Sequence, residues 1–372
     1  MKNSNAANPA EAGVINSRYM NSEADYKKFG VKPNTVEVWE DGLRGSEKPN
    51  NSEWEWWYFD AIMDDGTSLI IQFLNPAVIL PNRAPAVNFQ ITTPDGKHHR
   101  TILESTPDED SFGEGKCDVH FGRNSFVGDL KNYTLHVEEN DQFGADIRFT
   151  NLGTPFRPGT AYFAFGDHDE DYYTWLCIAP KCKVEGTLLI DGKQVAVSGY
   201  GYHDHQWGSK PYLAFFNNWT WSRQSLNGYS VTMFNMVSCK EYGYKRFPIV
   251  FIENEAGEIV FDSYEDVEYT MESTLFDSVS GKTYPAVQRQ IFHQGDLTLE
   301  YTLTPRKTLE SMLHFPNPTP EQAKEFAERG QKPSYMRFLG EGRVKLTKGN
   351  DVLIDETGEL IYECMFPGLE FK

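Results

Sequence analysis

The sequence has no apolar run long enough to span a bilayer, and its first residues, MKNSNAANPAEAG, lack the apolar core of a secretory signal peptide. We therefore expect a cytoplasmic protein without membrane insertion. Three N-glycosylation sequons, which begin at Asn50, Asn132 and Asn218, keep secretion open, because a chain trimmed of its signal peptide would look the same.

Cysteine is scarce and irregularly spaced. The five residues are Cys117, Cys177, Cys182, Cys239 and Cys364. Only Cys177 and Cys182 lie close together in the sequence, and no pair has the spacing of a metal site. The odd number and the scattered positions favour reduced thiols over a disulfide framework.

Basic residues are outnumbered, since 35 Lys and Arg stand against 54 Asp and Glu, a net charge of −19. This excess of negative charge argues against nucleic acid and anionic membranes as partners, because both select for basic patches. The nucleotide-binding motifs G-x-G-x-x-G and G-x-x-x-x-G-K-[ST] and the nucleophile elbow G-x-S-x-G are also missing. We expect no cofactor, and a neutral or apolar small molecule as the ligand.

Aromatic residues, in contrast, are abundant: 25 Phe, 19 Tyr and 8 Trp make up 14% of the chain. They suffice for a large core and for an aromatic-lined cavity. The length of 372 residues exceeds that at which single cores usually stop growing, so two domains are expected.

Short alternating strands, broken by glycine turns, fill most of the sequence. The turn signals are Asp95-Gly96, Asp191-Gly192, Asn227-Gly228, Glu255-Ala256-Gly257 and Glu356-Thr357-Gly358. Such strands, without helices between them, predict an all-β fold of two antiparallel barrels or sandwiches. We expect a loosely ordered arm at 1–35, a first domain at 36–208 and a second at 209–372, with a ligand cleft between the domains.

One helix is expected at about 319–329. Thr319 is its predicted N-cap, Pro320 its first residue, Gln322 the capping-box partner and Gly330 the C-terminal stop. The helix is interpreted as a lid or plug on a barrel.

The segment SGYGYHDHQWG, residues 198–208, concentrates the most chemistry. His203 and His205 can exchange protons near neutral pH, and Asp204 can orient or ionise them. The aromatic residues of the segment, Tyr200, Tyr202 and Trp207, offer apolar walls with polar atoms. The segment predicts a proton-handling pocket for an apolar ligand; the alternative is a turn whose His and Trp side chains fill a core.

A metal site is the other alternative for this segment. His203 and His205 share one face of a strand, but a first coordination shell needs a third and usually a fourth ligand. His168, in the acidic run FGDHDEDYY, is the best available donor, and nothing in the spacing requires it. We therefore expect no catalytic metal.

Two further clusters are candidates for the pocket wall. In EWEWWYFD, residues 53–60, alternation places Trp54, Trp56 and Tyr58 on one face of a strand and Glu55, Trp57 and Phe59 on the other. Glu55 is then either buried and paired or a ligand anchor, and the aromatic residues either line the pocket or form a core. In NWTWSR, residues 218–223, Trp219, Trp221 and Arg223 share a face, as a pocket wall for an oxygen-bearing ligand or as a cation–π stack on a barrel surface.

Two motifs together resemble the carotenoid 1,2-hydratase (hydroxyneurosporene synthase) superfamily: EWWYF, residues 55–59, and GYHDHQWG, residues 201–208. This superfamily includes kievitone hydratases and fungal lipocalin-like Diels–Alderases and hetero-Diels–Alderases. The resemblance implies two lipocalin-like β-barrels and a cofactor-free cyclase or (de)hydratase of secondary metabolism. It places acid–base chemistry on His205 and Trp207, with Asp204 preceding. The region Tyr229–Asn235, where the hydratases carry a further Tyr and Asp, has no Asp here, which leaves more room for a cyclase.

The function expected from sequence is therefore a cyclase of the Diels–Alderase or hetero-Diels–Alderase type, acting on an apolar polyketide or terpenoid. The alternatives are a hydratase of an isoprenoid double bond and a non-catalytic lipocalin-type carrier, and a homodimer is left open. In this scheme His205 is the acid/base or hydrogen-bond donor, positioned by Asp204, with Trp207 beside it. The residues expected to bind substrate are Glu55, Trp56, Trp57, Tyr58, Tyr200, Tyr202, His203, Trp219, Trp221, Arg223 and Asn235.

Overall fold

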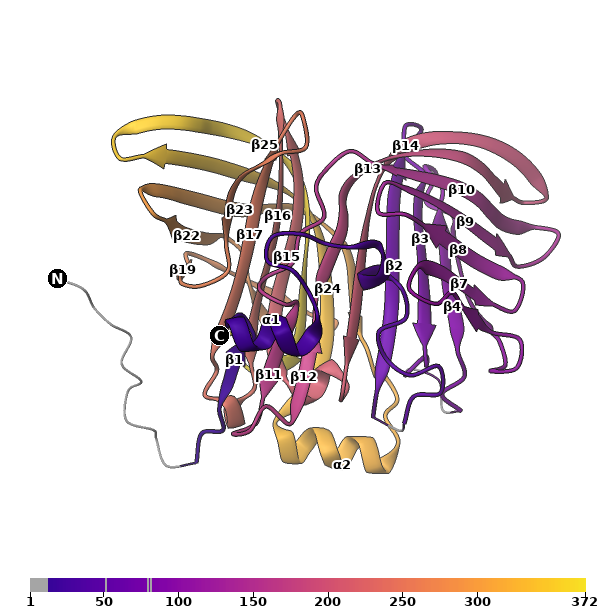
Figure 1. Cartoon of the computed structure of the whole chain (residues 1–372), viewed down its shortest axis with the longest axis horizontal. Helices are drawn as coiled ribbons and strands as arrows, with labels where there is room; N and C mark the ends of the chain where they lie inside the picture. Colours follow the sequence, from indigo (N-terminus) through magenta and orange to yellow (C-terminus); the bar gives the residue numbers. More distant parts are fainter. Residues whose placement is uncertain (1–12, 51, 79, 81) are drawn as a thin grey trace.

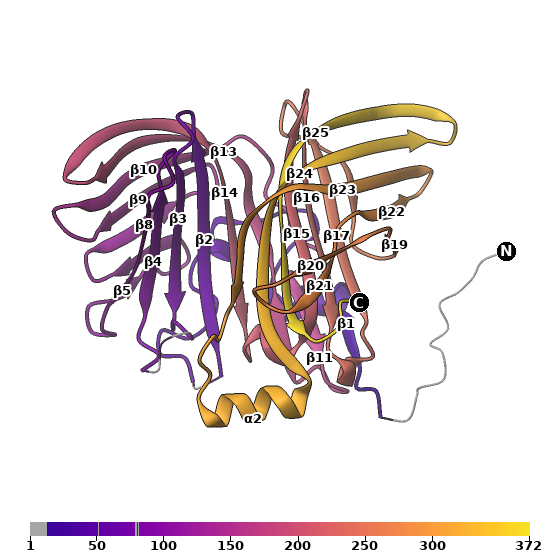
Figure 2. The ribbon, with the colours of Figure 1, turned by 180° about the vertical axis from the view of Figure 1, so that it is seen from behind.

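The computed structural model describes residues 13–50, 52–78, 80 and 82–372. Two large antiparallel sheets stand side by side, with β2 and β14 of the first sheet next to β15 and β24 of the second (Figures 1 and 2). Every strand pairing in the described residues is antiparallel. The prediction of an all-β fold is confirmed.

The first sheet has the order β5-β4-β3-β2-β14-β13-β10-β9-β8-β7-β6, and β12, β11 and β1 branch from the end of β14. Its strands are β1 (Ser17–Tyr19), β2 (Trp54–Met63), β3 (Ser68–Asn75), β4 (Ala86–Thr92), β5 (His98–Glu104), β6 (Ser111–Phe112), β7 (Cys117–Phe121), β8 (Asn124–Gly128), β9 (Asn132–Glu138), β10 (Phe143–Asn151), β11 (Tyr162–Phe165), β12 (Asp171–Thr174), β13 (Leu176–Ile190) and β14 (Lys193–Gly208).

The second sheet has the order β18-β17-β16-β15-β25-β24-β23-β22-β19, and β20 and β21 form a separate hairpin. The strands are β15 (Phe216–Leu226), β16 (Tyr229–Ser238), β17 (Arg246–Asn254), β18 (Ile259–Ser263), β19 (Val267–Met271), β20 (Thr274–Asp277), β21 (Lys282–Pro285), β22 (Gln288–Gln294), β23 (Leu297–Leu313), β24 (Gln331–Lys348) and β25 (Asp351–Gly368). The chain thus changes sheets between Gly208 and Phe216.

Four of the five predicted hairpin turns connect consecutive strands. The exception is Glu356-Thr357-Gly358, which lies inside β25 instead of ending a strand. The chain reverses earlier, at Gly349, whose φ of +56° suits a tight turn that glycine adopts without strain. The prediction is wrong because Gly358 packs in the sheet opposite Gly342 of β24.

Helices are few. The predicted helix is confirmed as α2 (Pro320–Arg329), with a capping box between Thr319 and Gln322 and with Gly330 in the left-handed conformation. It lies below the two sheets (Figure 1). The other helices are α1 (Glu23–Phe29) and the single-turn 3₁₀ segments η1 (Val38–Asp41), η2 (Tyr212–Ala214) and η3 (Lys240–Tyr242).

Part of the segment expected to be a loosely ordered arm is regular. Residues 1–12 lie outside the described residues, but β1 and α1 follow them. Arg18 pairs with Asp25 at 2.8 Å and with Asp169 at 2.6 Å, and these contacts hold α1 against the β11–β12 turn. Tyr19 donates a hydrogen bond to the carbonyl oxygen of Pro248, so this segment also touches the second sheet. Charge pairs with distant residues order a stretch that has no periodicity of its own.

Three large hydrophobic clusters build most of the core, one inside each sheet's curve and a third between the sheets, and a small fourth cluster contains Leu74, Ala77 and Ala86. The third contains Tyr173, Trp175 and Tyr202 from the first sheet and Trp221 and Phe234 from the second. Aromatic residues make up most of this third cluster, so part of the aromatic surplus of the sequence joins the two sheets.

The structure also shows the surroundings of the cysteines and of the sequon at Asn218. All five cysteines are buried and free. Asn218 is 1% exposed and its amide is bonded at the C-terminal Lys372, so this sequon is closed to glycosylation in the folded protein. Among the helices of the described residues, none is long and apolar enough to cross a membrane.

Glu253 of β17, in the second sheet, forms a buried polar contact with the segment that follows β10 of the first sheet. Its carboxylate accepts hydrogen bonds from the backbone N–H of Thr154 at 2.6 Å and from Ser230 at 3.2 Å. Burial raises the pKa of Glu253 from 4.5 to about 7. The neutral form is therefore favoured in the folded protein relative to the unfolded chain.

This contact predicts a pH-dependent stability. Because the folded pKa lies above the unfolded one, the free energy of unfolding should fall as the pH rises from 4.5 to about 7. Glu253→Gln, which stays neutral, should stabilise the protein by about 1–3 kcal/mol at about pH 8 and much less at about pH 5. Urea denaturation of both proteins at the two pH values measures this. If the free energies of unfolding of the two proteins differ equally at both pH values, the prediction is contradicted.

Candidate functional site

Successive side chains of β14 point to opposite faces of the sheet, and this divides the HDHQW motif into two sets. His203, His205 and Trp207 face the interior of the first sheet, where Trp207 belongs to the first core cluster. Tyr202 and Asp204 face the second sheet, and Tyr202 belongs to the cluster between the sheets. The motif therefore serves two environments.

His205 is fully buried and lies between two carboxylates. Its Nε2 is 2.8 Å from Glu55 Oε1, and its Nδ1 is 3.4 Å from Asp41 Oδ1. The ring stacks on Trp57 at a centroid distance of 4.7 Å and contacts Trp207 at 4.7 Å. Glu55 and Trp57 share one face of β2, as predicted. The side chain that lies against both of them is the His205 imidazole.

Asp41, at the end of η1, is the centre of this buried network. Its Oδ2 accepts a hydrogen bond from Tyr133 at 2.6 Å and lies 3.1 Å from His203 Nε2. His203 Nδ1 donates to the carbonyl oxygen of Tyr58, so both ring nitrogens of His203 face oxygen atoms of the protein. Burial works to raise the pKa of Asp41, but His203, His205 and Tyr133 outweigh it and hold that pKa below its usual value.

The prediction that Asp204 positions His205 is wrong. The two residues are neighbours in one strand, so their side chains lie on opposite faces, and Asp41 and Glu55 flank the imidazole instead. No motif marks Asp41, which ends η1 and is remote from β14 in the sequence. Glu55 belongs to the EWWYF motif, and its pairing was one of the two predicted alternatives.

Asp204 has its own set of donors. Its carboxylate accepts hydrogen bonds from Tyr202 at 2.8 Å, from Trp175 at 3.2 Å and from Gln206 at 3.1 Å. Burial raises the pKa of Asp204, while Gln206 and Tyr202 oppose the change. Asp204 is a carboxyl group held among aromatic rings on the side that faces the second sheet.

Charged side chains from both sheets meet on this side of β2 and β14. We call Tyr58, Asp60, Arg223, Tyr335, Arg337 and Glu363 the inter-sheet cluster. Asp60 of β2 pairs with Arg223 of β15 at 2.8 Å and lies 3.7 Å from Arg337 of β24. Tyr335 donates a hydrogen bond to Glu363 of β25.

Several polar atoms of this region have no hydrogen-bond partner among the described residues. They are the Nε atoms of Arg223 and Arg337 and the indole Nε1 of Trp221. Trp221 packs edge-on against Tyr202 at 5.0 Å, next to Asp204. Unpaired buried donors are rare in folded proteins, so each of them needs an explanation such as a ligand.

Burial also determines the charge balance of the inter-sheet cluster. It raises the pKa of Glu363 above its usual value, and it raises those of the Tyr58 and Tyr335 phenols. For Arg337, burial acts against the charge, but the neighbouring phenols and carboxylates outweigh it and raise its pKa. The Arg337 guanidinium therefore stays charged, while the Glu363 carboxyl group is biased toward its neutral form.

The remaining predicted binding residues fall into two groups. Trp56, Tyr58 and Trp219 pack against the hydrophobic cluster between the sheets, which includes Trp221. Two residues were predicted wrongly as pocket residues. Tyr200 is 57% exposed, because the first half of β14 projects beyond the core. Asn235 lies on the other face of β16, where it bonds Gln290 at 2.7 Å.

No three His, Cys, Asp or Glu side chains of the described residues come together in a group that could hold a metal ion. His168, the best third ligand from sequence, is exposed in the β11–β12 turn, whereas His203 and His205 are buried.

Two residues that sequence reasoning missed, Arg337 and Glu363, lie in the last two strands and belong to no motif. Asp60 could have been predicted as a site residue from the sequence, because it lies two residues after Tyr58 in β2 and therefore shares its face.

A protein-family model described as AttH-like matches residues 82–316, more than half of the chain. The sequence is also 23% identical over 292 residues to a hydroxyneurosporene dehydrogenase of Chlorobaculum tepidum, covering 67% of this chain and 76% of that protein. Two fungal relatives match over shorter stretches. They are the quinolone epoxide rearrangement protein asqO of Emericella nidulans (26% identical, 52% of this chain and 57% of that protein) and the Diels-Alderase ucsH of an Acremonium species (24%, 48% and 49%).

Solved structures share the fold. CghA, crystallised with Sch210972, superposes with a TM-score of 0.60 at 14% identity, covering 86% of this chain and 90% of that one. Kievitone hydratase from Nectria haematococca superposes with a TM-score of 0.54 at 16% identity, covering 88% of this chain and 94% of that one. The resemblance to the hydratase and Diels–Alderase superfamily, stated from the two motifs, is confirmed.

Proposed function

This chain belongs to the AttH-like family, and we propose that it is a cofactor-independent cyclase of secondary metabolism that binds its substrate between the two sheets. The names of its relatives support this class of function, since they include a Diels-Alderase, a rearrangement protein and a hydratase. The chain spans only about half the length of the two fungal sequence relatives, so the reaction itself is argued from the site.

The observation that carries the proposal is the set of unpaired donors between the sheets. Arg223 and Arg337 offer N–H groups from two strands, and the Trp221 indole adds a third donor from the same side. Donors fixed in a water-poor site stabilise charge that develops on a carbonyl oxygen without any reorganisation at the moment of reaction. A conjugated carbonyl polarised in this way becomes a more reactive partner for a diene in ring closure.

The aromatic side chains between the sheets supply the other requirement of a cyclase. A flexible polyene reacts only when its two ends are held close together in the correct orientation. Trp56, Tyr58 and Trp219 present rigid apolar surfaces at the cluster between the sheets. The substrate class that fits is an apolar polyketide or terpenoid chain with at least one carbonyl group.

A hydratase or dehydratase is the second candidate, and Asp204 favours it. A carboxyl group with a raised pKa can deliver a proton to an alkene or to a leaving hydroxyl group. In both reactions, the role of His205 differs from that of Asp204. It is a positioning residue, because its contacts to Glu55 of β2 hold that strand against β14 and so fix Tyr58, Asp60 and Asp204 on the opposite face.

The products distinguish the candidate functions. The purified protein is incubated with linear polyenes that carry an α,β-unsaturated carbonyl group, and products are separated by chromatography with mass detection. A product with the mass of its substrate and a new ring supports the cyclase. Gain or loss of one water supports the hydratase or dehydratase. Bound but unchanged polyene would contradict both and indicate a carrier.

A further inference from the structure

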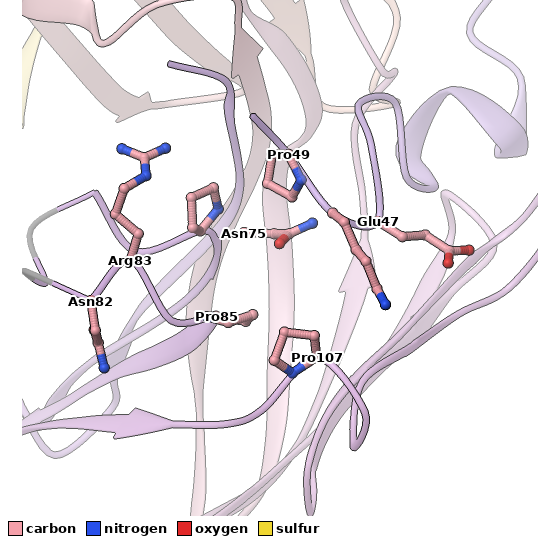
Figure 3. A pocket seen from close by; sticks show the side chains of 9 residues that line it. Glu47, Pro49, Asn75, Asn82, Arg83, Pro85 and Pro107 are labelled. Atoms are coloured by element: carbon pink, nitrogen blue, oxygen red, sulfur yellow. The ribbon is translucent and has the colours of Figure 1, made fainter. Parts of the chain in front are cut away.

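A cavity away from the inter-sheet cluster lies at one end of the first sheet. This half-open cavity has a volume of about 440 Å³ and is lined by residues of the 47–49 loop, by the end of β3 and by the segments that flank β4 and β5. Figure 3 shows Asn75 among Pro49, Pro85 and Pro107, with Arg83 to one side. The volume lies within the range of small-molecule sites.

Asn75 forms the floor of this cavity and has an unused acceptor. The residue is 1% exposed, and its Nδ2 donates to the carbonyl oxygen of Ser46 at 3.2 Å. Its Oδ1 has no hydrogen-bond partner among the described residues. A buried amide oxygen of this kind is costly to leave unpaired, so the cavity offers a place for a hydroxyl or N–H donor.

Two cations line the same cavity. Lys48 and Arg83 form no ion pair with any residue that the structure describes, although the protein as a whole carries a net charge of −19. Arg83 is half-buried and anchored by a hydrogen bond to the carbonyl oxygen of Glu53 at 2.8 Å. Glu47 is the one acidic residue of the lining, so the wall keeps a net positive charge.

From these observations we propose a second ligand site, for a small organic carboxylate that also carries a hydroxyl group. The carboxylate pairs with Arg83 and Lys48, because guanidinium groups bind carboxylates with two parallel hydrogen bonds. The hydroxyl donates to Asn75 Oδ1, and the apolar body packs on Pro49, Pro85 and Pro107. This site does not depend on the proposed cyclase activity.

Phenyllactate is a suitable probe, since it combines a carboxylate, an adjacent hydroxyl and an apolar ring. Binding to the full chain is measured by isothermal titration calorimetry at low ionic strength, with phenyllactamide and phenylpropionate as matched ligands. We expect saturable binding of phenyllactate. The amide, which lacks the charge, should bind about tenfold more weakly, and phenylpropionate, which lacks the hydroxyl, several-fold more weakly.

The protein variants test the location. Arg83→Gln should weaken phenyllactate binding about tenfold. Arg123→Gln, at an exposed arginine of the β7–β8 turn outside the cavity, should leave phenyllactate binding unchanged. Equal binding by wild type and Arg83→Gln, equal binding of the acid and the amide, or no saturable binding up to about 20 mM phenyllactate would overturn the proposal.

Discussion

Arg223→Gln is expected to lower the turnover of the cyclisation about 10²–10³-fold, the usual effect of removing one preorganised donor from a developing oxyanion. The substitution removes the charge and the unpaired Nε while Trp221 keeps its place on the same strand. Because the donor acts on charge that grows in the transition state, kcat should fall more than the apparent affinity for substrate. Steady-state kinetics, with a polyene that the protein converts, measures kcat and the apparent affinity separately.

Arg289→Gln is the matched control for this variant. Arg289 of β22 pairs with Glu300 at 2.7 Å, much as Arg223 pairs with Asp60 at 2.8 Å, but it lies at the surface. Its loss should leave kcat unchanged. If Arg223→Gln retains wild-type kcat and only KM rises, Arg223 binds substrate without assisting the reaction.

Asp41→Ala is expected to cost about 3–5 kcal/mol of stability, because it leaves two buried histidines without their shared carboxylate. Asp41 and both imidazole rings are fully buried, so solvent cannot replace the lost partner. The pKa of Asp41 is lowered in the folded protein, so its contribution is present above the ordinary carboxyl value and is lost as the pH falls below it. Urea denaturation at neutral pH measures the free energy of unfolding.

Asp146→Ala provides the comparison for this second prediction. Asp146 also pairs with a histidine, His136, at 2.6 Å, but its side chain is 71% exposed. Exposed pairs of this kind contribute at most about 1 kcal/mol. Similar losses in the two variants would show that the Asp41 network is not a buried anchor of β2 and β14.

Several features followed from the sequence because they depend on neighbours along the chain. Hairpin turns need a residue with positive φ between two strands, and Asp-Gly and Asn-Gly pairs mark them. Helix α2 has its stop and start signals within a few residues. Alternation along β2 separated Glu55 and Trp57 from Trp56 and Tyr58 without knowledge of any partner strand.

The same rule, applied to β14, separates Asp204 from His205, so their closeness in sequence was misleading. What lies beside His205 was decided by tertiary structure, since Asp41 reaches it from the end of η1 and Glu55 from the paired strand β2. The inter-sheet cluster likewise joins Asp60, Arg223 and Arg337 from three distant strands. The sequence by itself determined the residue types, most of the turns and the alternation of side chains along each strand, because these depend on local backbone geometry. Only the pairing of distant strands and the packing of the two sheets decided which charged groups meet, because register and sheet order arise from long-range contacts that no short motif encodes.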